Sequence, residues 1–165
     1  MSDLPVRSAG HRSVPSFLRP KPARHGVPVL LQTAREREYR EMEQALRASG
    51  GLAGTDHVTG LLAARTDQPI SRLARWIVAH EVVSFEWKAG TMLPLFQFDL
   101  AGMTLRPEVT AAIRELEAVL NDWEICLWFA RPNAWLGDAA PVDCIGVDAR
   151  ALHDAARADR YLARS

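Results

Sequence analysis

In the segment PISRLARWIVAHEVVSFEWKAGTMLPLFQF, residues 69–98, the spacing of the apolar residues changes half-way along, which indicates a helix followed by strands. Pro69 suits the first position of a helix, where the missing backbone N–H is not needed. After Pro69 the apolar residues recur every three or four positions, which is typical of a helix with one buried face. The predicted buried stripe consists of Ile70, Leu73, Ala74, Ile77 and Val78.

From Val83 onward the apolar spacing becomes two. Val83, Phe85 and Trp87 alternate with polar residues, which indicates a strand. The turn Lys88-Ala89-Gly90 and a second apolar run over 93–98 complete a hairpin. Pro94 cannot donate a backbone hydrogen bond, so we expect the returning strand to lie at a sheet edge there.

A short helix is expected before this stretch, with Asp56 as its cap and Val58, Leu61 and Leu62 as its apolar residues. Two short helices followed by a hairpin is the order of elements in a winged helix-turn-helix. In that interpretation the helix 69–80 meets DNA, and the contacting side chains are Arg72, Arg75 and, at the tip of the wing, Lys88. The alternative is that these cations only solvate the outer face of a core helix.

The chain before residue 50 has two parts. Tyr39, Met42 and Leu46 recur at helical spacing and predict a helix over 30–47. Residues 1–28 hold five prolines and five cations, which predicts a disordered basic arm. Such an arm either contacts phosphates or remains a solvated tail. The 165-residue chain has 20 basic and 20 acidic residues, and the arm, at +4, leaves the remainder at −4. This balance excludes a protein that coats nucleic acid with its whole surface.

The last third is predicted to be helical. Pro107 opens a helix with Val109, Ile113, Leu116 and Leu120 on its buried face. Asp122 is expected to cap a second helix that runs from Trp123 to about Arg131 and ends before Pro132. Asp148 is expected to cap a final helix, whose apolar positions are Leu152, Ala155, Ala156 and Leu162.

No recognisable catalytic pattern is present in the sequence. The five histidines form no His-x-x-x-His pair, and there is no Walker loop, Gly-x-Gly-x-x-Gly turn or Gly-x-Ser-x-Gly elbow. We therefore expect no enzymatic activity, metal or cofactor. Cys126 and Cys144 form no Cys-x-x-Cys pair, and we expect both to be small core residues. Free cysteines of this kind are typical of a reducing compartment, so we expect a cytoplasmic protein. No run reaches the roughly 18 apolar residues of a membrane span, and no secretory signal is recognisable.

Three tryptophans fall within residues 122–143, DWEICLWFARPNAWLGDAAPVD. Trp123 and Trp128 lie on the predicted helix, where we expect them in the core. Trp135 follows in a loop, where a large aromatic side chain either packs or serves binding. Trp135 is therefore the better candidate for an interface.

The motif Trp128-Phe129-Ala130, Pro132-Asn133-Ala134-Trp135-Leu136-Gly137 and Pro141-Val142-Asp143 resembles the toxin-binding domain of Xre/MbcA/ParS-type antitoxins. In order and spacing the resemblance covers residues 108–165, and it extends to about residue 50 through Leu93-Pro94 and Phe96–Asp99. The chain departs from the family pattern in two places, one of which is the rather apolar helix 69–80 at the position of the recognition helix. Asp138 stands where the family has a second glycine, in a turn that Asp also tolerates.

The resemblance implies a partner and a set of contact residues. Members of this family pair with co-encoded RES-domain toxins, which consume NAD, and many repress their own operator DNA. It implies that the loop and turn are shaped by Pro132, Asn133, Leu136, Gly137, Pro141 and Asp143, with Trp135 beside them. It also implies that the final helix approaches the toxin with Arg157, Arg160, Tyr161 and Arg164.

Together these features predict a mainly α fold with a small β-hairpin (α+β). The expected regions are an arm over 1–28, a helix-turn-helix-like region with a hairpin over 29–106, and a helical toxin-binding-like domain over 107–165. The predicted function is an antitoxin-like protein that occludes a RES-type toxin, with DNA-binding autoregulation as an added role. The alternative is a stand-alone DNA-binding regulator. A homodimer is the usual state of helix-turn-helix proteins on palindromic sites, and no membrane association is expected.

Overall fold

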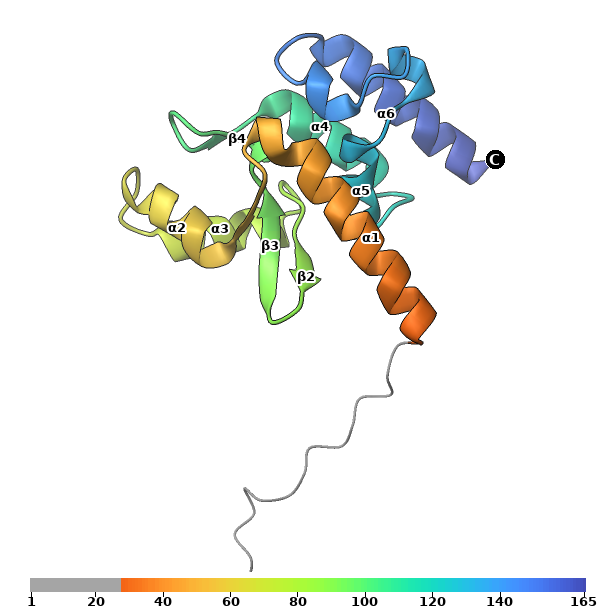
Figure 1. Cartoon of the computed structure of the whole chain (residues 1–165). Helices are drawn as coiled ribbons and strands as arrows, with labels where there is room; N and C mark the ends of the chain where they lie inside the picture. The colour runs from red at the N-terminus through yellow and green to blue at the C-terminus, as the bar shows by residue number, and fades with distance from the viewer. Residues whose placement is uncertain (1–27) are drawn as a thin grey trace, which may run out of the picture.

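A computed structural model describes residues 28–165, so the arm predicted over 1–28 lies, except for Pro28, outside the described residues. The first half holds α1 (Val29–Leu46), β1 (Leu52–Gly54), α2 (Thr55–Ala63), α3 (Pro69–Val78), β2 (Phe85–Trp87) and β3 (Gly90–Pro94). Short segments follow: the 3-10 turn η3 (Leu95–Gln97) and the strand pair β4 (Phe98–Asp99) and β5 (Thr104–Leu105). The mainly α fold with a small antiparallel hairpin is confirmed (Figure 1).

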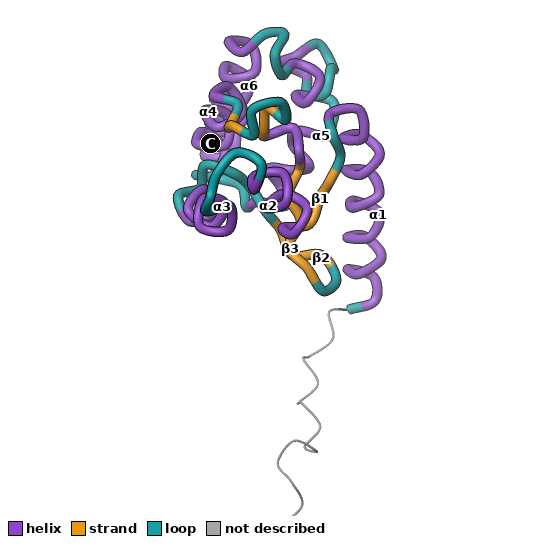
Figure 2. The backbone as a smooth tube through the Cα atoms, turned by 90° about the vertical axis from the view of Figure 1, so that its left-hand side faces the viewer, coloured by secondary structure: helices purple, strands orange, loops and turns teal. Residues whose placement is uncertain are grey.

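The second half is helical throughout. It consists of α4 (Pro107–Leu116), α5 (Asp122–Ala130), the 3-10 turns η4 (Ala134–Leu136) and η5 (Pro141–Cys144), and α6 (Ala149–Arg164). Helix α6 packs along α4, and α1 packs against α5. Figures 1 and 2 both place α1 and the α2–α3 pair on opposite sides of the β2–β3 hairpin.

Strand β1 was not predicted from the sequence, and its presence changes the position of Pro94 in the sheet. The sheet order is β1-β3-β2, so β3 is the central strand and not an edge. Pro94 pairs with Leu52 of β1. On the other side of β3 the pairing with β2 extends only to Phe85 and Met92, so no β2 residue lies opposite Pro94 to accept the N–H that proline lacks. The expectation of a sheet edge at Pro94 was therefore wrong for the strand.

The buried side chain of Gln97 forms hydrogen bonds with backbone groups beyond the end of the β2–β3 pairing. Its Oε1 accepts the backbone N–H of Val83 at 2.6 Å. Its Nε2 donates to the carbonyl oxygens of Val83 and Pro94, both at 3.0 Å. Gln97 is 1% exposed, so this amide satisfies backbone groups that water cannot reach.

Helix α3 begins at Pro69 as predicted, but its predicted buried stripe was wrong. Only Leu73 is buried, whereas Ile70 and Val78 are 73% and 80% exposed and Ala74 is exposed as well. The reason is the position of the contacting elements. Helix α3 rests on α2 through Leu73 and, partly, Trp76 and Ile77, and no element of residues 28–165 covers Ile70, Ala74 or Val78.

Two other expectations about the helices also needed correction. Helix α5 begins at Asp122 and is capped by Asn121 in a reciprocal capping box with Glu124, not by Asp122. Helix α2 has Gly54 at its N-cap, and Asp56 makes no cap hydrogen bond. Asp148 caps α6 as predicted, accepting the N–H of Ala151 at 2.9 Å. Leu162 is 58% exposed and does not join the core.

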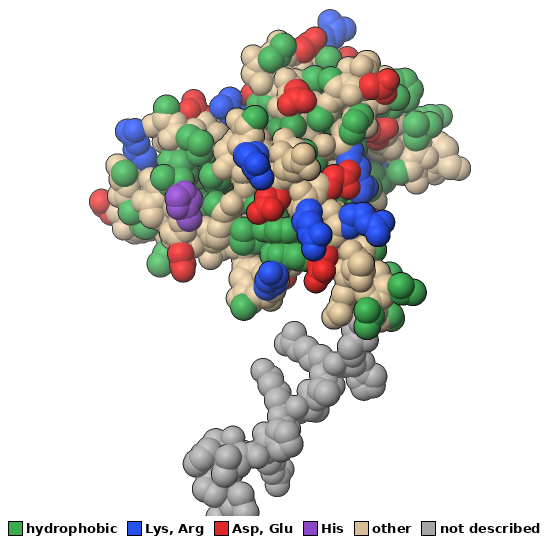
Figure 3. All heavy atoms as spheres, viewed as in Figure 1, with side chains coloured by type: hydrophobic (Ala, Val, Ile, Leu, Met, Phe, Trp, Pro, Cys, Tyr) green, Lys and Arg blue, Asp and Glu red, His purple; other side chains and the backbone are tan. Residues whose placement is uncertain are grey.

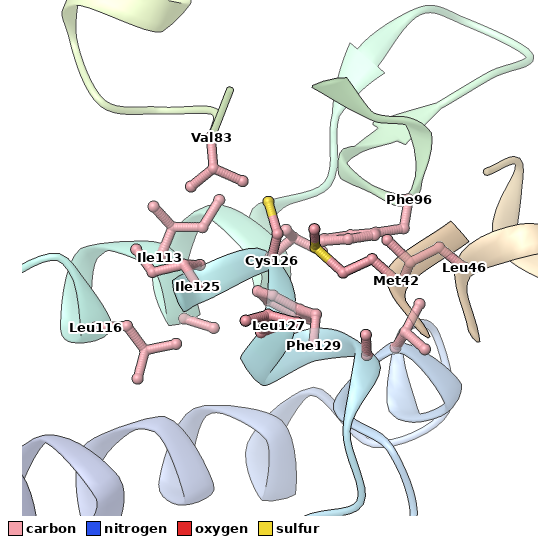
Figure 4. Close-up of a cluster of buried hydrophobic side chains, with 14 of the residues drawn as sticks. Met42, Leu46, Val83, Phe96, Ile113, Leu116, Ile125, Cys126, Leu127 and Phe129 are labelled. Carbon is pink, nitrogen blue, oxygen red and sulfur yellow. The ribbon is translucent and has the colours of Figure 1, made fainter. Parts of the chain in front are cut away.

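The main core joins the two halves of the chain. Met42 and Leu46 of α1 meet Phe96 and the α5 residues Cys126 and Phe129 (Figure 4). The Phe96 and Phe129 rings lie 4.5 Å apart. A second, smaller core lies between α2, α3 and β3, around Val58, Leu62, Leu73, Leu93 and Phe98. Regions 29–106 and 107–165 thus share one hydrophobic core.

A run of stacked aromatic side chains fixes the hairpin against α1 and α5. Tyr39 stacks on Trp87 with ring centroids 4.2 Å apart, and Trp87 in turn lies 5.8 Å from Trp123. The guanidinium of Arg35 covers the outer side of Trp123 at 4.2 Å. Helix α1 is held at its middle by this stack, while its first two turns, Val29 to Arg37, stay exposed. Over residues 28–165 no helix combines the length and apolarity that crossing a membrane would require.

Candidate protein-binding groove

The loop after α5 is built around Asn133. This residue is 8% exposed, and its backbone exchanges hydrogen bonds with Ala139 and Asp138. Its side-chain Oδ1 accepts the N–H of Trp135 at 2.9 Å and thereby caps η4. The loop is consequently a closed, internally bonded turn.

The carboxylate of Asp159, on α6, gathers three donors. Trp128 Nε1 and Asn133 Nδ2 donate to Oδ2 at 2.7 Å and 2.8 Å, and Trp135 Nε1 donates to Oδ1 at 2.9 Å. The three donors come from the end of α5 and the following loop, so Asp159 ties that segment to α6. We call these four residues the Asp159 cluster.

The Asp159 cluster forms one wall of an open groove of about 1130 Å³ between α1, α5 and α6. Trp135 is 56% exposed at its rim, and Leu31 and Leu162 are both 58% exposed beside it. The apolar lining consists of Leu31, Leu120, Trp123, Leu127, Trp128, Pro132, Trp135 and Leu162. Exposed apolar side chains gathered around a groove are typical of a protein-binding surface.

The charged groups of the groove are already paired. Arg131 makes a bidentate pair with Glu41, both contacts at 3.0 Å, which lowers the pKa of Glu41 and raises that of Arg131. Glu38 accepts the indole N–H of Trp123 at 2.8 Å. These contacts hold Glu38, Glu41 and Arg131 in fixed positions beside the groove.

The structure gives the conformation and exposure of each predicted loop residue. Leu136 is half-buried, and Gly137 adopts φ +64°. Asp138 follows with φ +66°, a left-handed conformation that explains why glycine would serve equally well there. Pro141 is buried at the start of η5, whereas Asp143 is exposed and lines no part of the groove.

The predicted residues of α6 divide between two faces. Arg157, Tyr161 and Arg164 are exposed and recur at spacings of four and three, so they share an outward face. Arg160 instead turns toward α4, where its guanidinium lies 2.5 Å from the Glu115 carboxylate. His153 lies 3.3 Å from the same carboxylate. Arg160 therefore ties α6 to α4.

The predicted DNA contacts are all exposed. Lys88 is at the hairpin tip with φ +53°. Arg72 leans toward Trp76, with its guanidinium carbon 6.0 Å from the ring centroid. Figure 3 shows acidic and basic side chains interspersed on the face toward the viewer, without a large patch of one sign.

Two free cysteines, Cys126 and Cys144, and the possible metal ligands of residues 28–165 were considered as further sites. Burial, and secondarily Asp122, raises the pKa of Cys126, and burial raises that of Cys144. Within residues 28–165 no group of three or more His, Cys, Asp or Glu side chains is arranged to hold a metal ion.

Sequence reasoning found Asn133 and Trp135 but missed two contributors to the groove. Asp159 is one of two acidic residues on α6, the other being Asp154, and nothing in its spacing marks it. The first turns of α1 were also overlooked, although the run Val29-Leu30-Leu31 at a helix start was a usable signal. Comparisons of this chain with protein-family models, curated proteins and solved structures gave no match.

Proposed function

We propose that the chain is an antitoxin-like protein that binds a RES-type, NAD-consuming toxin through the groove and occludes it. The observation that carries this proposal is Trp135, which is more than half exposed yet bonded at both its indole and backbone N–H groups. An aromatic side chain already held in its binding orientation loses little freedom on association, and such residues dominate interface energies.

The identity of the partner rests on the resemblance of residues 128–143 to antitoxin toxin-binding domains. The mechanism needs no chemistry from this chain, since covering the toxin blocks its substrate. Arg157, Tyr161 and Arg164 form an exposed face of α6 that lines no part of the groove, and we expect this face to contact the toxin separately.

The direct test uses the RES-domain protein encoded beside this chain. We expect the purified chain to form a stable complex with it and to inhibit its NAD consumption stoichiometrically. Trp135→Ala should weaken the complex by at least about tenfold, as truncation of an interface hot-spot tryptophan does. The matched control, Val147→Ala, truncates an apolar side chain that is 82% exposed but lies outside the groove, and it should bind normally. Absence of both a complex and inhibition would refute the proposal.

A second candidate function is DNA binding, and the order α1-β1-α2-α3-β2-β3 favours it, since this is the order of a winged helix-turn-helix. Among residues 28–165, the cations on α3 and at the wing tip are Arg72, Arg75 and Lys88, so the binding expected from this surface is weak and salt-dependent. A mobility-shift assay with the flanking operon DNA tests it. Loss of the shift in Arg75→Glu supports this role, and no shift by the unaltered chain refutes it.

A further inference from the structure

A second pocket of about 610 Å³ lies where the two halves of the chain meet, and it shares no lining residue with the groove. Its walls come from the turn η2 (Arg47–Ser49) at the end of α1, the β4–β5 loop, the residue before α4, and η5 (Figure 1). A pocket of this size between two parts of a chain is typical of a site for a small molecule.

Two arginines line this pocket without an anionic partner. The Nε of Arg106 donates to the carbonyl oxygen of Phe98 at 3.1 Å, which holds its half-buried side chain at the wall. Within residues 28–165 the two terminal nitrogens of Arg106 make no hydrogen bond, and no carboxylate lies within 4.0 Å of Arg106 or Arg47. A guanidinium with free terminal N–H groups can bind a carboxylate through two parallel hydrogen bonds.

The pocket is locally positive, although residues 29–165 together carry a net charge of −4. Among the described residues that line it, Asp99 is the one carboxylate. Its Oδ1 accepts the backbone N–H of Ala101 at 3.1 Å, which turns it into the β4–β5 loop. Two guanidinium groups against one carboxylate leave a charge of +1, which favours an anionic ligand.

The remaining wall is apolar. Leu100 is 46% exposed, Val142 is buried and Ile145 is half-buried. Gly50 lets the β4–β5 loop approach the end of α1, since a Cβ added there would lie 2.9 Å from the Leu95 Cβ and 3.6 Å from the Leu100 Cδ1. A charged wall opposite an apolar one fits a ligand that has both kinds of surface.

We propose that this pocket binds a small organic carboxylate. The carboxylate pairs with Arg106 and Arg47, and the apolar body of the ligand lies against Leu100, Val142 and Ile145. Such a ligand contacts both halves of the folded chain at once, and it therefore stabilises the folded state in proportion to its concentration. Binding here requires no toxin, because the groove lies elsewhere on the molecule.

Benzoate is a suitable probe, because it carries one carboxylate on a compact apolar ring. An NMR titration of the isotope-labelled full chain should show saturable shifts of the Ser49, Gly50 and Ala101 amides, with a dissociation constant of about 1 mM or lower. The indole signal of Trp135 should stay unchanged, since that residue lines the groove. Benzamide, which has the same shape without the charge, should bind at least about tenfold more weakly.

Two kinds of variant separate the charge from the shape of the pocket. Arg106→Gln should weaken benzoate binding about tenfold, because it removes charge-assisted hydrogen bonds, and Arg47→Gln should have a smaller effect, because Arg47 is exposed. Ala48→Phe fills the pocket without changing its charge and should also weaken binding. The matched control is Arg40→Gln, at an exposed arginine of α1 outside the pocket. Circular dichroism verifies that each variant is folded.

Three results would overturn the proposal. One is the absence of saturable shifts with benzoate at up to about 10 mM, roughly ten times the expected dissociation constant. Another is unchanged benzoate binding in both Arg106→Gln and Ala48→Phe. The third is complete displacement of benzoate by an equal concentration of inorganic phosphate, which has no apolar body. Toxin binding is measured separately with Trp135→Ala, so its failure would leave these results unaffected.

Discussion

The indole N–H of Trp135 donates to Oδ1 of Asp159 at 2.9 Å, although the two residues are 24 positions apart in the sequence. This contact orients an exposed tryptophan at the rim of the groove. The second oxygen of Asp159 holds Trp128 and Asn133, so one carboxylate fixes the end of α5, the loop and α6.

Replacing Asp159 should disorganise the groove. In Asp159→Ala three donors lose their acceptor, two of them from side chains that are buried or half-buried, and we expect the free energy of unfolding to fall by about 1–3 kcal/mol. Urea denaturation followed by tryptophan fluorescence measures this change. The control is Asp154→Ala on the same helix, whose carboxylate is 59% exposed and makes only a surface pair with Arg150. Equal stability of the two variants would contradict the role given to Asp159.

Replacing Gln97 should destabilise the hairpin. Gln97→Leu keeps the volume but leaves three backbone groups of Val83 and Pro94 without a partner in a dry region, so we expect a loss of about 1–3 kcal/mol. Thermal unfolding by circular dichroism tests it. Gln68→Leu changes an exposed glutamine just before α3, whose side chain makes no cap hydrogen bond, and should have little effect. A matching loss in both variants would show that Gln97 has no special role.

The pair between Glu41 and Arg131 should make α1 docking depend on pH. The hydrogen bonds from Arg131 lower the pKa of Glu41 in the folded chain. This contribution is present above the unfolded pKa of about 4.3 and is lost as the pH falls through the lower folded value. Because both groups are more than one-third exposed, solvent screening keeps the effect small. An NMR titration of the Glu41 carboxyl carbon measures it, and Arg131→Met should return the pKa toward its usual value.

The Cys126 thiol should resist alkylation in the folded chain. Burial raises its pKa, so its thiolate is scarce at neutral pH, and its sulfur is inaccessible. With iodoacetamide at pH 8 we expect slow labelling at Cys144 and labelling of Cys126 only in denaturant. Mass spectrometry of tryptic peptides distinguishes the two sites. Rapid labelling of Cys126 under native conditions would disagree with its place between Met42 and Phe96.

Local signals in the sequence determined most of the helices and the hairpin. Pro69, Pro107 and Asp148 mark helix starts correctly, because a missing N–H or a capping carboxylate acts within a single turn. The change from a spacing of four to a spacing of two marks where α3 gives way to β2 for the same local reason. The positive φ of Asp138 also agrees with the residue types in that turn.

The tertiary structure alone decided which faces are covered and which distant groups meet. The apolar residues of α3 have the spacing of a core stripe, yet Ile70 and Val78 are exposed in the part of the chain that the structure describes, and periodicity carries no information about which face is covered. Strand β1 made β3 central, and Gln97 satisfied the backbone that β2 leaves open. The link from Asp159 to Trp128, Asn133 and Trp135 depends on how α6 packs against α4. Such contacts arise from packing between elements far apart in sequence, whereas a sequence pattern reports only the periodicity within one element.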